Sequence, residues 1–256
     1  MKKSIFLVCL FVTFGSFGPT ILAQSKSKLF KKSIDIGRAK DVRTDISFFA
    51  GELNINSETT MLAECFYGYK DGFIKPDMTY REVGTIGYLS VVSEKKDKGI
   101  INDETNRWNL SLNKDVKNSL SINLKAGKST IDLEGCNLSS FDYKMTAGES
   151  KINLRNTSVP QVKFNLLAGE SLIDLSGKWK NDGVADIKGG VGEVTVKVPY
   201  KTGVIIYITG LLGDVSIPFF DRDGDAYVND SYKKSKNTLT IYIHGAIGQI
   251  NVKMEE

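Results

Sequence analysis

The sequence has one histidine, three cysteines and, beyond its first residues, no long apolar run, and each scarcity excludes a class of protein. Because His244 is the only histidine, zinc catalysis of the usual kind is excluded, and a Cys–His or Ser–His pair can form only through this residue. We expect its imidazole to be structural or exposed, because it lies in an alternating run between Ile243 and Gly245. No segment after residue 23 approaches the ~20 apolar residues of a transmembrane helix, so we expect none in the mature chain.

The N-terminus has the order of a secretory signal peptide. Two lysines precede an apolar stretch over residues 5–14, a Gly/Pro break follows, and small and apolar residues end at Ala23. We predict that residues 1–23 are cleaved near Ala23 and that the protein is exported to the periplasm, the cell surface or the medium. Cys9 raises the alternative of a lipoprotein, but it follows two large apolar residues rather than the small residues of a lipidation site.

The mature chain also lacks a marked excess of charge. Removing two lysines leaves 34 minus 2, or 32, basic residues against 30 acidic ones, a net charge of +2. Nucleic-acid proteins normally show a strong basic excess, so nucleic acid is not an expected partner. The two remaining cysteines, Cys65 and Cys136, either form one disulfide or stay unpaired as small apolar residues.

What the sequence does contain is a repeat of 21 residues. "LKAGKSTIDL" (124–133) recurs as "MTAGESKINL" (145–154) and as "LLAGESLIDL" (166–175), and apolar and polar residues alternate on both sides of each glycine. This pattern predicts two strands that meet at a glycine corner. The repeated glycines are Gly127, Gly148, Gly169 and Gly190.

One such coil cannot bury enough apolar surface to offset the entropy of ordering its backbone, so the coils must stack. We therefore predict an all-β fold, a β-solenoid with parallel ladders and a single inward file of Ile131, Ile152 and Ile173. Further copies lie at 46–55 and 241–252, where Gly248 aligns with Gly192 and Gly213. The predicted division is an N-terminal β-rich portion at 24–125 and solenoid repeats at 126–256, with an insertion around 219–237.

The N-terminal portion interrupts the repeat. Its strand-like runs "TYREVGTIGYLSVV" and "RWNLSLN", separated by the charged segment "SEKKDKGIINDETN", predict hairpins that cover the open edge of the first coil.

No residue is assigned as catalytic, cofactor-binding or metal-binding. A polar column of Asp132, Asn153, Asp174, Thr195 and Ser216 alternates carboxylates with neutral groups, and it supplies too few oxygen ligands for a cation. The segment "DRDGDAYVND" places three aspartates at alternate positions, Asp221 to Asp225, but it departs from a calcium loop. We predict a hairpin tip there.

Two surface features remain open. The aromatic residues either form a platform for a glycan or pack between strands, and the basic clusters "KLFKKS" and "SYKKSK" either contact anionic envelope polymers or remain solvated. The aromatic residues in question are Trp108, Trp179, Tyr67, Tyr69 and Tyr88.

The segments "DISFFAGELNI", "IKPDMTYREVGTIGYLSVV", "LSINLKAGKSTIDLEGCNL", "FDYKMTAGESKINL" and "KGGVGEVTVKVP" resemble the toast-rack proteins of bacterial envelopes, relatives of the C-terminal domain of LiaF-type stress-response proteins. The resemblance extends from about Lys31 to Gly203 and implies a β-repeat fold. Members of the family restrain an envelope-stress sensor kinase or are described as surface adhesins. The family offers no catalytic residues to carry over.

These observations favour a non-enzymatic exported protein whose solenoid surface binds an envelope protein or polymer, as in adhesion. A periplasmic regulator of an envelope-stress response is the second hypothesis. The third is a carbohydrate-active enzyme on a β-helix, which requires a groove with two carboxylates at catalytic separation.

Overall fold

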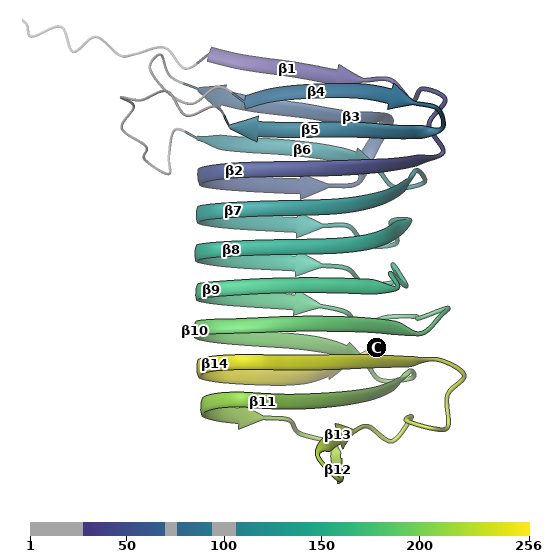
Figure 1. Ribbon diagram of the computed structural model, residues 1–256, viewed down its shortest axis with the longest axis vertical. Helices are drawn as coiled ribbons and strands as arrows, with labels where there is room; N and C mark the ends of the chain where they lie inside the picture. The colour runs from purple at the N-terminus through teal and green to yellow at the C-terminus, as the bar shows by residue number, and fades with distance from the viewer. Residues whose placement is uncertain (1–27, 70–75, 94–105) are drawn as a thin grey trace, which may run out of the picture.

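The computed structural model describes residues 28–69, 76–93 and 106–256, and within these ranges it contains strands and no helix. The predicted signal peptide and Cys9 lie outside the described residues. Figure 1 shows a stack of flat coils, each made of one long strand that bends at one edge of the stack so that its two halves form opposite walls. The chain is therefore all-β and forms a β-solenoid, as the repeat predicted.

The strands belong to one sheet. They are β1 (Lys28–Ile34), β2 (Asp41–Asn56), β3 (Glu58–Tyr69), β4 (Pro76–Val83), β5 (Ile86–Ser93), β6 (Arg107–Asn113), β7 (Lys117–Asp132), β8 (Leu138–Asn153), β9 (Gln161–Asp174), β10 (Gly183–Pro199), β11 (Gly203–Ser216), β12 (Asp221–Asp223), β13 (Ala226–Val228) and β14 (Thr238–Glu255). Their order in the sheet is β1-β3-β6-β2-β7-β8-β9-β10-β14-β11-β13-β12, with β5 paired to β2 and β4 to β5.

The bend of each coil depends on its glycine. Gly148 has a φ of 141°, which L-residues with a side chain rarely adopt. A Cβ at this position would lie 1.8 Å from the carbonyl oxygen of Gly127 in the coil beside it. Backbone therefore occupies the space that a side chain would need, so the repeat requires glycine at the corner.

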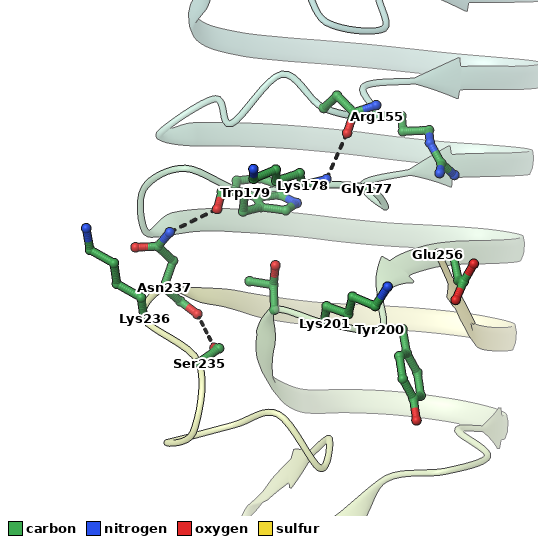
Figure 2. A pocket seen from close by; sticks show the side chains of 12 residues that line it. Arg155, Gly177, Lys178, Trp179, Tyr200, Lys201, Ser235, Lys236, Asn237 and Glu256 are labelled. Carbon is green, nitrogen blue, oxygen red and sulfur yellow. Dashed lines mark hydrogen bonds between the residues drawn. The ribbon is translucent and has the colours of Figure 1, made fainter.

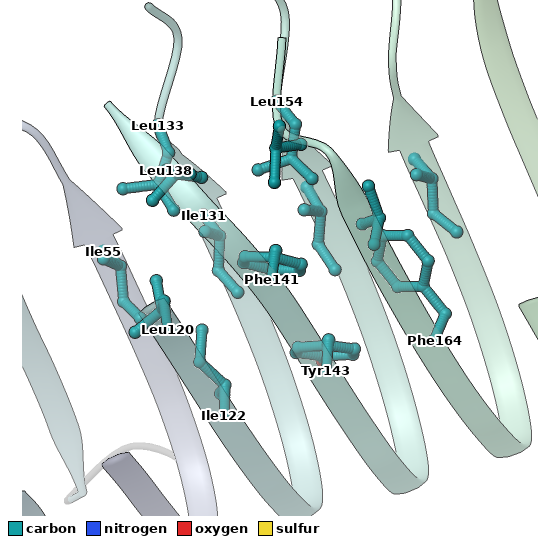
Figure 3. Close-up of a cluster of buried hydrophobic side chains, with 14 of the residues drawn as sticks. Ile55, Leu120, Ile122, Ile131, Leu133, Leu138, Phe141, Tyr143, Leu154 and Phe164 are labelled. Carbon is teal, nitrogen blue, oxygen red and sulfur yellow. The ribbon is translucent and has the colours of Figure 1, made fainter. Parts of the chain in front are cut away.

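The interior follows from the stacking. Ile131 pairs with Ile152 and Ile152 with Ile173, and all three are buried, which confirms the predicted inward file. Figure 3 shows Phe141 and other apolar side chains of this core projecting between the two walls. Next to the corner the walls converge, and small serines replace large apolar residues. Their hydroxyls stay satisfied, since Ser129 Oγ lies 2.8 Å from the Tyr143 hydroxyl.

The prediction that Gly190 continues the glycine column was wrong by two residues. Gly169 pairs with Gly192, a step of 23 residues, because the loop between β9 and β10 accommodates two extra residues. The predicted polar column changes accordingly. Asp174 is followed by Lys197, not by Thr195, so opposite charges are neighbours on successive coils.

The spatial order of the last coils also differs from their order in the sequence. The C-terminal strand β14 lies between β10 and β11, parallel to both, with Gly248 paired to Gly192 on one side and to Gly213 on the other. In Figure 1 the yellow strand β14 separates the green strands β10 and β11. The chain thus leaves β10, skips one level to form β11, and returns to fill the space between them.

The N-terminal portion closes the first coil, as predicted. Strand β5, paired with β4 in an antiparallel hairpin, covers the first half of β2, and β6 covers its second half. Most of the predicted charged turn, residues 94–105, lies outside the described residues. The predicted boundary after residue 125 falls within the continuous strand β7, so the division of the chain into two portions stays a prediction.

Alanine substitutions at two glycines of positive φ should distinguish the cost of a steric clash at the corner from the cost of backbone strain alone. We expect Gly148→Ala to lower the free energy of unfolding by at least about 2 kcal/mol, because the new methyl group meets backbone that cannot move aside. Gly135→Ala is the matched control, since Gly135 also has a positive φ of 69° but faces open space. Its expected cost is about 1 kcal/mol. Urea denaturation measures both, and equal costs would contradict the proposed role of the corner.

Candidate functional site

The displaced order of the last coils opens a cleft of about 580 Å³ on the loop edge of the stack. Loops after β8, β9 and β10 contribute to it, together with the segment that leads into β14. A volume of this size lies in the range of ligand-binding pockets. The lining residues are Arg155, Asn156, Gly177, Lys178, Trp179, Tyr200, Lys201, Thr202, Ser235, Lys236, Asn237 and Glu256.

One wall of the cleft rests on Trp179. The indole is 4% exposed, and its Nε1 donates a hydrogen bond to the Leu175 carbonyl oxygen at 2.8 Å. Asn237 Nδ2 donates to the Trp179 carbonyl oxygen at 2.9 Å, a bond drawn in Figure 2 that joins the β9 loop to the segment before β14. In the same loop Lys178 N donates to Asn156 Oδ1 at 2.8 Å. The backbone of this wall is therefore fixed.

The opposite wall is the short connection from β10 to β11. Tyr200 N donates to the Glu255 carbonyl oxygen at 3.0 Å, and Gly203 N donates to Ser235 Oγ at 2.6 Å. These bonds hold both ends of the connection, while the Tyr200 side chain stays 52% exposed. The wall thus presents an aromatic ring on a well-anchored backbone.

The side chains around the cleft are mainly cationic. Arg155 is partly engaged, since its Nε lies 3.7 Å from Glu134 Oε1 and its Nη1 donates to Ser176 Oγ at 3.2 Å. The exposed side chains of Lys178, Lys201 and Lys236 have no carboxylate within 4.0 Å in the part of the chain that the structure describes. Against these four cations stands one acidic side chain, Glu256. The site can attract and bind an anion, but its lining residues do not include the carboxylate pair of a glycosidase.

The aromatic residues considered for a platform do not gather at one place. Trp179 contributes to the cleft wall but its indole is buried, and Trp108 and Tyr67 are also buried in the core. Tyr88 lies under the guanidinium of Arg81, at 4.3 Å from the ring centroid. The side chain of Tyr69 lies outside the described residues. Packing within and across strands therefore accounts for Trp108, Tyr67 and Tyr88.

The two basic clusters differ in their surroundings. Lys236 and Ser235 of "SYKKSK" line the cleft, whereas Lys233 forms an ion pair with Asp223 at 3.1 Å. In "KLFKKS", Lys31 lies 3.6 Å from a carboxylate oxygen of Glu64, and the ammonium of the following lysine donates to a backbone carbonyl. The basic cluster "SYKKSK" was therefore the one sequence signal that pointed to residues of the cleft. Arg155, Lys178, Tyr200 and Lys201 were missed, because they come from three separate loops, none of which carries a pattern of its own.

His244 lies on the outer face of β14. Its Nδ1 is 2.9 Å from Thr209 Oγ1, and its Nε2 is 3.8 Å from Asp186 Oδ1, so a hydroxyl, an imidazole and a carboxylate follow one another. The ring also stacks on Tyr242 at 6.1 Å between centroids. The group crosses three stacked strands on an open wall away from the cleft, and we assign it a structural role.

The aspartate-rich segment forms the predicted hairpin. Strands β12 and β13 pair antiparallel, and the tip contains Gly224 with a φ of 62°. Within the described ranges no three histidine, cysteine or acidic side chains converge as metal ligands would. Asp132 and Asp174 are separated by Asn153, whose Nδ2 donates to Asp132 Oδ1 at 3.0 Å.

A second exposed feature runs along the glycine corners. Val191, Ile247 and Leu212 stand in register on β10, β14 and β11, and each side chain is between 55% and 70% exposed. The earlier coils carry alanine at this position, namely Ala50, Ala126, Ala147 and Ala168. We call Val191, Ile247 and Leu212 the corner ridge. At this register position only the last three coils carry large apolar side chains, although Leu167, one position earlier on β9, is also exposed.

Both cysteines of the described chain are free and buried. The disulfide between Cys65 and Cys136, one of the two alternatives that the sequence left open, is therefore not formed. Burial raises the pKa of the Cys65 thiol to about 12, and it also raises the pKa of Cys136. Neither thiol has the lowered pKa of a reactive cysteine.

Thiol titration tests this arrangement. Native processed protein should react slowly with Ellman's reagent even at pH 9, because a folded-state pKa raised by burial keeps the thiols protonated. After unfolding in guanidinium without reductant, both Cys65 and Cys136 should react at once. A disulfide would instead yield no thiol in denaturant until a reductant is added.

The architecture defines a class, an all-β solenoid of stacked coils with a capped N-terminal end and a cationic cleft at its C-terminal end. The chain belongs to the toast-rack family, since it matches the N-terminal domain of toast_rack, DUF2154, over residues 23–169 and 143–197. Among the described residues, no helix is both long enough and apolar enough to cross a membrane.

The chain is also similar to solved structures, of which one shares the fold closely enough to support the architecture. A candidate cell adhesion protein from Clostridium sporogenes is 27% identical, with a TM-score of 0.66, over 90% of this chain and 100% of that protein. A candidate adhesin from Bacteroides fragilis, 13% identical over 89% of this chain and 98% of its own, has a TM-score of 0.31, too low to support an argument. A comparison with curated proteins finds no significant match.

Proposed function

We propose that the protein is a non-enzymatic, exported component of the bacterial cell envelope that acts by binding, as an adhesin does. The observation that carries the proposal is the cationic cleft. Several loops of a rigid stack hold a half-exposed tyrosine and three lysines around one opening, and none of these lysines has a carboxylate within 4.0 Å among the described residues. The family and the similar cell adhesion candidate from Clostridium sporogenes support an envelope role.

The architecture suits binding better than catalysis. A solenoid of stacked coils gives a long surface whose shape is fixed by backbone ladders, so a ligand meets a preorganised site at low entropic cost. The cleft residues can attract, orient and pack against a ligand. They include neither an activated nucleophile nor a pair of acidic groups that could share acid–base work.

Retention of envelope material tests the proposal. The processed protein, recovered from cells that express the full chain, is fixed to beads and incubated with cell-envelope fragments of the producing bacterium. We expect several-fold more retention than on beads that carry the same amount of heat-unfolded protein. Retention equal to that of the unfolded control would contradict an adhesion-like function.

Export is tested separately. The full chain expressed in a bacterium with a general secretory pathway should be recovered outside the cytoplasm, and N-terminal sequencing should begin at Gln24. Recovery from the cytoplasm with the first 23 residues intact would refute the predicted signal peptide.

A further inference from the structure

We propose that the cleft binds an anionic glycan, a polymer of sugar rings that carries phosphate or carboxylate groups. This inference rests on the proposed binding function and names the ligand class of the same site.

The acid groups of the ligand are indicated by charge. Lys178, Lys201 and Lys236 come from three different loops, so the fold brings to the lining of one cleft three lysines that are far apart in the sequence. None of them has a carboxylate within 4.0 Å in the described part of the chain. Only some lysines elsewhere on the stack meet acids, as Lys128 meets Glu149 at 2.9 Å and Lys197 meets Glu255 at 2.9 Å, so it is their shared opening that distinguishes the three cleft lysines. A multiply charged anion would neutralise these three cleft lysines.

The sugar component is indicated by the remaining lining groups. The Tyr200 ring is exposed beside Lys201 and can pack on the apolar face of a sugar ring while the ammonium group holds an acid substituent. The Oδ1 atom of Asn237 accepts no hydrogen bond in the described structure, whereas its Nδ2 is fixed by the Trp179 carbonyl oxygen. This amide oxygen is therefore oriented and available to accept a hydrogen bond from a sugar hydroxyl.

The shape of the site favours a chain over a small ion. The cleft of about 580 Å³ is open along the loop edge and has fixed walls on both sides. A free phosphate supplies a single acid group, while a polymer can place successive acid groups near several lysines. In duplex nucleic acid stacking covers the faces of the bases, so Tyr200 cannot pack on them.

Binding to matched polymers tests the inference. Fluorescently labelled phosphomannan and polygalacturonate are the anionic probes, and neutral mannan and methyl-esterified polygalacturonate are their uncharged counterparts. At 0.15 M salt we expect the anionic polymer that binds more tightly to exceed its own neutral counterpart in affinity by at least about tenfold. We also expect binding of this anionic polymer to weaken as salt rises. Preference for phosphomannan or for polygalacturonate identifies the acid group.

Two triple variants with the same charge change locate the site. Lys178→Gln, Lys201→Gln and Lys236→Gln in one chain should weaken binding of the anionic polymer at least about tenfold. The control combines Lys125→Gln, Lys144→Gln and Lys151→Gln, three exposed lysines outside the cleft, and should stay within about twofold of the wild type. Thermal unfolding verifies that both variants fold. Tyr200→Ala should weaken binding with no change in net charge.

Equal losses in the two triple variants, or equally tight binding of a DNA duplex, would overturn the inference. The envelope-retention assay distinguishes this failure from that of the proposed function. If the cleft variant retains envelope fragments like the wild type, the proposed adhesion-like function is supported and the anionic glycan site is refuted. In that case a further variant, Val191→Ser with Ile247→Ser and Leu212→Ser, tests whether the corner ridge binds the fragments. If the wild type retains none, both fall.

Discussion

The close approach of successive coils at the glycine corner is the constraint on which the rest of this structure depends. Carbonyl oxygens of Gly51, Gly127 and Gly148 lie where the next coil would otherwise carry a Cβ, at 1.8 to 2.0 Å. This contact permits a turn tight enough for one strand to serve both walls. It also fixes the register, because a coil displaced by one residue would place a side chain against backbone. The inward isoleucine file and the serines beside the corner follow from that register.

The sequence predicted this part of the fold well, since one corner is repeated with the same residues. Gly127, Gly148 and Gly169 recur at one spacing, and each is followed by a buried Ser and Ile at the same positions. The register was mistaken only at "KGGVG", where Gly189, Gly190 and Gly192 offer several glycines and the loop before β10 absorbs two extra residues. Periodicity cannot decide between glycines two positions apart, because alternation places both on the same face.

The order of the final coils could not be obtained from the sequence in the same way. Coils centred on Gly192, Gly213 and Gly248 share the same pattern, so each can stack on any other. The pattern therefore shows which residues align between coils, but not which coils are adjacent in the stack. The cleft is a consequence of that order. Its lysines lie in loops whose contacts are set by which coil is adjacent, and only the cluster that contains Lys236 was visible as a local signal.

The insertion of β14 between β10 and β11 also determines when the molecule can be completed. A solenoid whose coils stack in chain order can add each turn as it emerges from the ribosome or the translocon, but here β11 must wait without its neighbour until residues 238–255 arrive. During that interval the lower end of the stack presents unpaired backbone and apolar side chains to other molecules. The 18-residue strand β14 thus completes the stack. A chain cut short before it would lack the β14 coil and would also leave the β11 coil without the strand that joins it to β10.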